Sequence, residues 1–191
     1  AEELSQDTAR GHAVSDTVFV ECLANYRKEE KEERRSIGET EFVVEESVRS
    51  KELKGGDISG IIAFIDLSLG EKVDNLLDAH QEVSGNMLKG IRHATAWSSD
   101  PKIPVSHSKP VEGLMGEKAF IDGVRYLGSR NLSFDAWMYF DQLHELHNLA
   151  KKVPNTPIVI NHMGAPLKLG RWQKKQTEMH AIWKSELRKL A

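Results

Sequence analysis

The chain alternates between two spacings of apolar residues, and this alternation limits its fold more than any other feature. Short β-branched and apolar segments, typical of buried strands, are separated by segments with apolar residues three and four apart, typical of helices. The expected strands are Thr17–Ala24, Ile58–Leu67, Leu88–Trp97, Leu132–Tyr139 and Pro157–Asn161. The expected helices cover 39–54, 73–83, 120–127, 143–150 and 179–190. Repeated strand–helix units predict an α/β fold with a parallel sheet.

Composition narrows the class of protein further. The 191 residues, 39% of them hydrophobic, are enough for one domain spanning 1–191. Lys and Arg number 26 against 29 Asp and Glu, and this net charge of −3 argues against a nucleic-acid partner. No apolar run is long enough to cross a membrane. Cys22 is the single cysteine, which excludes an internal disulfide, so we expect a reducing, cytoplasmic location.

Several patterns are less informative than they first look. The segment 98–112 contains three prolines and no periodicity, which predicts a long irregular loop, and such loops are often functional. The histidines of the segment 144–147 are three residues apart, so this is not the zinc-binding HExxH motif, and we expect His144 to face solvent. The remaining candidates without a partner at ligand spacing are His12, His80, His107 and His180.

Two residues at the expected strand ends carry the most chemistry. Ligands of parallel α/β folds bind at the carboxyl ends of the strands. Arg92 shares a strand face with the small Gly90, so its guanidinium is placed to bind a carboxylate or another anion, or to form a structural ion pair. His162 follows a buried strand. It is placed to ligate a metal, to donate a hydrogen bond to a carbonyl oxygen that gains charge, or to serve as a structural histidine.

The other polar and aromatic groups near strand ends leave more than one interpretation open. Trp137 and Tyr139 alternate with Met138, and the period of two alone does not say which set faces a site. Glu21 and Asp66 are carboxylates near the ends of the first two strands, where catalysis and buried pairing are equally compatible with the pattern.

Several of these segments, taken together, resemble the amidohydrolase-related family, whose known members include hydrolases of 2-pyrone-4,6-dicarboxylate and of sugar-acid lactones. The matching segments are TVFVE, GETEFV, a buried strand ending in Asp66, GIRHATAW, LSFDAWMY and IVINHMGAP. The resemblance covers almost the whole chain and implies a partial TIM (β/α)₈ barrel in which the five strands correspond to strands 2 to 6. The family's HxH motif of the first strand and aspartate of the eighth have no counterpart here, so we expect an internal fragment of a longer enzyme.

The resemblance also implies roles for individual residues. His162 matches a histidine that polarises the scissile carbonyl or meets a metal, and Arg92 matches an arginine that grips a substrate carboxylate. Trp137 and Tyr139 fall where relatives line the pocket, whereas Phe140 replaces a histidine found in many relatives. The implied activity is hydrolysis of a lactone or related cyclic ester that carries a carboxylate. Relatives differ in their use of metal, so the resemblance allows one divalent metal ion in the full-length enzyme without requiring it.

The isolated fragment is expected to differ from the whole enzyme in activity and in association. The fragment alone is expected to be inactive, because the general base of the family lies outside it, and its open sheet edges are expected to favour self-association. The alternative to a hydrolase is a non-catalytic α/β module that binds a small anion or a partner.

Overall fold

The computed structural model describes residues 1–11, 13–53 and 56–190, and in them strands and helices alternate along the chain. The strands are β1 (Asp16–Val20), β2 (Asp57–Ala63), β3 (Leu88–Arg92), β4 (Ser133–Ala136) and β5 (Ile158–Ile160). The helices are α1 (Glu2–Thr8), α2 (Ile37–Glu52), α3 (Val73–Ser84), α4 (Lys118–Ser129), α5 (Leu143–Lys152) and α6 (Gln176–Leu190). No helix in this part of the chain is both long and apolar enough to span a bilayer.

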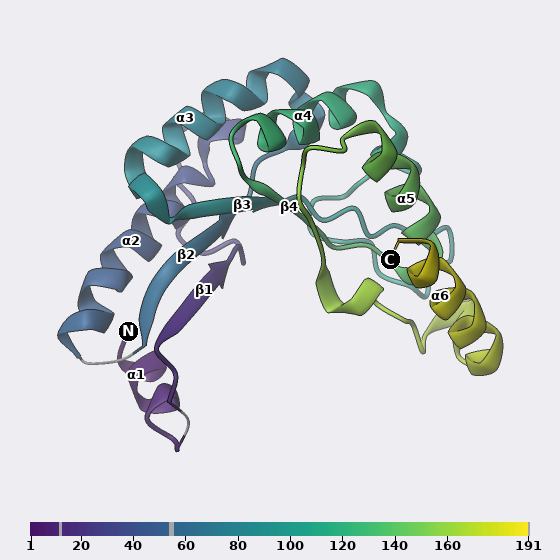
Figure 1. Ribbon diagram of the computed structural model, residues 1–191, viewed down its shortest axis with the longest axis horizontal. Helices are drawn as coiled ribbons and strands as arrows, with labels where there is room; N and C mark the ends of the chain where they lie inside the picture. Colours follow the sequence, from purple (N-terminus) through teal and green to yellow (C-terminus); the bar gives the residue numbers. More distant parts are fainter. Residues whose placement is uncertain (12, 54–55, 191) are drawn as a thin grey trace. The chain divides into compact units, whose positions relative to one another are not determined.

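The first of two compact units comprises residues 1–65 and 72–91. In it β2 pairs in parallel with β1 on one side and with β3 on the other, with Val18 opposite Gly60 and Ile62 opposite Gly90. The helices α2 and α3 pack along one side of these strands (Figure 1). Neighbouring strands are therefore consecutive in the chain, as they are in a (β/α) barrel.

A buried histidine joins the helices α2 and α3 of this unit. His80 in α3 is fully buried, and its ring nitrogens lie 3.3 Å from Ser36 Oγ and 2.8 Å from Thr40 Oγ1. Burial lowers the pKa of His80 to about 4, because the charged imidazolium is poorly solvated there, and the positive charges of Arg27 and Arg34 add to the effect. His80 is thus a neutral core residue.

We expect the stability of the chain to fall when the pH drops from about 6.5 to 4. In this range the unfolded chain protonates His80 near its ordinary pKa of about 6.5 while the folded chain does not, so protons favour unfolding. The difference from a folded pKa of about 4 corresponds to about 3 kcal/mol. Urea unfolding at several pH values measures this loss of stability: His80→Gln should make the pH dependence shallower, and the same change at the exposed His180 should not. Equal slopes for wild type and His80→Gln would contradict this account.

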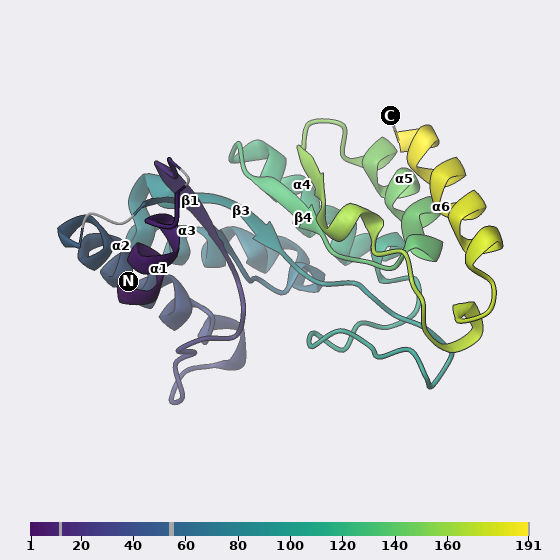
Figure 2. The ribbon, with the colours of Figure 1, turned by 90° about the horizontal axis from the view of Figure 1, so that it is seen from below.

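The second unit comprises residues 66–71 and 92–191. Here β4 pairs in parallel with β5, with Asp135 opposite Val159, and the helices α5 and α6 lie side by side (Figure 2). Aromatic pairs fill the core: Phe120 meets Phe134 edge-on at 5.8 Å between ring centroids, and Phe140 meets Trp172 at 4.8 Å. Phe140, the departure from the resembled family, is thus a core residue.

The structure confirms the α/β class and the positions of the expected strands and helices, but the expected carboxyl ends of the strands were too long. The segments after Val20, Ala63, Arg92, Ala136 and Ile160 leave the sheet, although those after Ala63 and Ala136 are still mostly apolar. Their backbone groups find other partners; the amides of Trp97 and Tyr139, for instance, both donate to Gln142 Oε1. The short helix α1 was not expected, and the predicted helix end at Lys54 lies outside the described residues, as does His12. His144 is exposed and 98–112 holds neither helix nor strand, both as expected.

Candidate functional site

Three of the residues selected from the sequence come together in the second unit, at the carboxyl ends of strands. Arg92 is the last residue of β3, Trp137 immediately follows β4, and His162 lies two residues beyond β5. The strand ends of a parallel α/β fold deliver side chains to one edge, which is where such folds bind their ligands. The site is therefore built from segments that are distant in the sequence.

Trp137 is the centre of this group. The guanidinium carbon of Arg92 lies 5.9 Å from the centroid of the Trp137 ring, and the ring of His162 meets it edge-on at 5.9 Å. The ring of His107 stacks on Trp137 at 6.1 Å with an angle of 26° between the planes. We call Arg92, His107, Trp137 and His162 the Trp137 cluster. It combines a guanidinium, two imidazoles and a flat aromatic surface, which suits an anionic ligand with a planar part.

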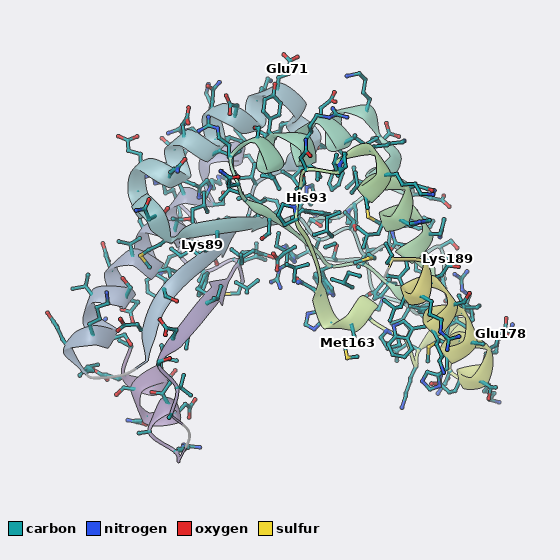
Figure 3. The ribbon with its side chains drawn as sticks, viewed as in Figure 1. Glu71, Lys89, His93, Met163, Glu178 and Lys189 are labelled. Atoms are coloured by element: carbon teal, nitrogen blue, oxygen red, sulfur yellow. The ribbon has the colours of Figure 1, made fainter. Side chains whose placement is uncertain are left out.

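The backbone at His162 is unusual. His162, Met163 and Ala165 all have left-handed conformations, with φ of 49°, 54° and 39°. Each such non-glycine residue costs about 1–3 kcal/mol and persists only where surrounding contacts impose it. One contact comes from α6, where Trp183 Nε1 donates to the Met163 carbonyl at 2.7 Å. The Met163 side chain projects into solvent at this turn (Figure 3). The strained backbone thus includes His162, the histidine of the Trp137 cluster that follows β5.

The loop 98–112 carries His107 to Trp137. Ser106 N donates to the Ala96 carbonyl at 3.0 Å, and the Ser106 hydroxyl donates to the Ala94 carbonyl at 3.3 Å. The Tyr139 hydroxyl donates to the Pro104 carbonyl. Tyr139 is only 7% exposed, and through this bond it anchors the loop. His107 itself was passed over in the sequence, where only its place in a long loop after a strand pointed to it.

A second polar group lies beside the Trp137 cluster in the same unit. His93, next to Arg92, is buried against Phe120 of α4 with 5.4 Å between ring centroids (Figure 3). Its Nδ1 accepts the Leu67 N–H at 3.1 Å and lies 3.6 Å from Asp66 Oδ1. Burial lowers the pKa of His93 to about 4, while Asp66 acts in the opposite direction. The residue is thus a neutral imidazole that fixes the segment after β2.

Asp66 and His93 also line a cavity of about 470 Å³, whose other walls include Ser108, Lys109, Leu114 and Glu117.

Among the described residues, no three His, Cys, Asp or Glu side chains gather closely enough to hold a metal ion. The described side chains therefore do not by themselves fit a metal centre.

Comparisons with known proteins show what the chain is similar to. No family model matches it. One curated relative, the uncharacterized protein y4mH of Sinorhizobium fredii (strain NBRC 101917 / NGR234), is 27% identical over 125 residues, which are 63% of this chain and 40% of the relative. Two crystal structures of an amidohydrolase from Burkholderia multivorans, one with bound HEPES and one with bound zinc, match 99% of this chain and 53% of theirs. Their TM-scores are 0.63 and 0.65, at 19% and 18% identity.

These matches confirm the fold class. Nearly every residue of the chain follows the fold of the two amidohydrolase structures, so the chain has the α/β fold of a partial TIM barrel. The chain spans about half the length of the structures it matches and less than half of the curated relative. At this level of identity the likeness establishes the fold and leaves the reaction to the chemistry of the site.

Proposed function

We propose that the chain contributes the substrate-binding and carbonyl-polarising groups of a hydrolase that acts on a lactone or related cyclic ester bearing a carboxylate. The observation that carries this proposal is the convergence of Arg92 and His162 on Trp137. The fold, shared with amidohydrolase structures, is compatible with hydrolytic chemistry. The residue types in the Trp137 cluster favour a substrate that is anionic and planar.

Each group has a distinct task in this proposal. Arg92 binds the substrate carboxylate through a pair of parallel N–H donors, which fixes both its position and its orientation. Trp137 supports the flat lactone ring. His162 donates a hydrogen bond to the carbonyl oxygen, which becomes negatively charged when water attacks, so the bond is stronger in the transition state than in the ground state.

The Trp137 cluster supplies no carboxylate base for the attacking water, and we assign none of its members that role. Arg92, His107 and His162 surround Trp137, and a carboxylate is not among them. Loss of a general base typically costs a factor of about 10² to 10⁴ in rate. We therefore expect the 191 residues alone to bind a carboxylated lactone without hydrolysing it measurably, and hydrolysis to require the gene product that contains them.

The test uses two lactones of equal size, one with a carboxylate and one with a carboxamide at the same carbon. We expect the gene product to hydrolyse the carboxylate lactone with a kcat/KM about 10- to 100-fold higher than that for the carboxamide lactone. The reason is that a hydrogen-bonded charge contributes about 1.5–3 kcal/mol. Acid release at constant pH measures the rate. Trp fluorescence of the 191-residue chain measures binding. Equal rates for both lactones would rule out the role of Arg92, and tight carboxylate binding without turnover in the gene product would instead indicate a binding module.

A further inference from the structure

Two hydrogen-bonded side chains, one buried and one half-buried, lie next to members of the Trp137 cluster in the sequence. Asn161, the residue before His162, donates from Nδ2 to Asp135 Oδ2 at 3.0 Å. Asp135 is 5% exposed, and its other oxygen accepts a hydrogen bond from the Ser133 hydroxyl at 3.1 Å. Asp135 lies two residues before Trp137, and residues two apart in extended chain point to the same side. The pair thus connects the segment of Trp137 to the segment of His162.

The orientation of the Asn161 amide is set by this contact. An ionised carboxylate only accepts hydrogen bonds, so the NH₂ end of the amide must face Asp135. The other end, Asn161 Oδ1, is buried and has no hydrogen-bond partner among the described residues. A buried acceptor without a partner costs free energy, and it is tolerated here because the charge-assisted bond to Asp135 holds the amide in place.

The backbone next to Asn161 shows what this bond secures. The strand β5 ends at Ile160, and the chain enters its left-handed turn at His162. A strained turn needs contacts on both sides to persist. Trp183 provides one on the far side through the Met163 carbonyl, and the Asp135–Asn161 bond provides the one on the near side.

We infer that Asp135 and Asn161 are a positioning pair that holds the His162 ring against Trp137 in the orientation needed for its hydrogen bond to the substrate. This inference rests on the proposed function of His162, although the contact itself does not. A misplacement of about 1 Å at a reacting group can cost about 10²-fold in rate. Because neither residue belongs to the Trp137 cluster, to which we assign substrate binding, loss of the pair should lower kcat while changing KM little.

The test reverses the pair. Asn161→Asp places two carboxylates face to face and removes the donor. The double variant Asp135→Asn with Asn161→Asp restores one donor and one acceptor with their places exchanged. Asn161→Ala removes the donor without adding a charge, and Ser133→Ala serves as a control that leaves the Asp135–Asn161 bond intact. Thermal unfolding of each variant reports whether it folds.

The first readout is the NMR signal of the His162 ring in the 191-residue chain, which the Trp137 ring current shifts because the rings lie 5.9 Å apart. We expect both single changes at Asn161 to move this signal, and the double variant to return it toward the wild-type position. The second readout is kcat for the carboxylate lactone in the gene product, with a loss of about 10- to 100-fold in the single variants and recovery in the double variant.

The two readouts separate the possible failures. An unmoved His162 signal in Asn161→Asp and Asn161→Ala, or a double variant that stays as far displaced as the single one, would overturn the positioning pair whatever the activity. A signal that moves and is restored, with turnover unaffected throughout, would confirm the contact and overturn the role proposed for His162.

Discussion

Replacement of His162 by phenylalanine should lower kcat for the carboxylate lactone by about 10²- to 10³-fold, the usual cost of removing one donor to a developing oxyanion. Phenylalanine keeps a flat ring for the edge-on contact with Trp137, at 5.9 Å in the wild type, and lacks the N–H. KM should change little, because the lost bond gains its strength only in the transition state. Initial rates in the gene product over a range of lactone concentrations separate the two parameters.

A second variant separates the donor from the backbone. His162 has φ of 49°, a region that asparagine adopts more readily than most residues. His162→Asn therefore keeps the turn but shortens the donor, and we expect a loss of kcat almost as large as in His162→Phe. If both variants kept wild-type kcat and only raised KM, His162 would be a binding residue and another group would have to polarise the carbonyl.

The sequence was informative about this site because the strands can be located from local patterns, although their carboxyl ends were set too late. Continuous apolar runs located the strands, and the polar residue that ends such a run is a candidate whatever the rest of the fold. Arg92 lies within one expected strand and His162 just beyond another, and the structure places both within 6 Å of Trp137. Helix positions were equally accessible, since stripes of apolar residues depend only on the spacing along one helix.

The features that the sequence did not reveal depend on contacts between distant segments. His107 reaches Trp137 only because Tyr139 and Ser106 hold the loop 98–112 in place, and no local pattern encodes that path. The early strand ends have the same origin: Gln142 and His93 accept backbone N–H groups that a longer strand would have used in the sheet. Hydrophobicity marks which residues are buried and says nothing about which partner satisfies each backbone group.

Replacement of Arg92 by methionine should lower kcat/KM for the carboxylate lactone by about 10- to 100-fold and leave that for the carboxamide lactone nearly unchanged. In the wild type the guanidinium carbon of Arg92 lies 5.9 Å from the centroid of the Trp137 ring. Methionine keeps an unbranched chain of similar reach beside this ring and removes the positive charge. The ratio of the two lactones matters more than either value, because damage to the fold would lower both together. Thermal unfolding of the variant reports such damage separately.

Lysine at the same position separates charge from geometry. Arg92→Lys retains the positive charge but offers a single ammonium in place of a planar fork with two parallel donors. If the carboxylate is held by the fork, lysine should recover only part of the loss seen in Arg92→Met. Full recovery by lysine would mean that a point charge suffices and that Arg92 does not orient the substrate. If both variants kept the preference for the carboxylate lactone, Arg92 would not bind the carboxylate. His107, which stacks on the Trp137 ring, would then be the candidate for that role.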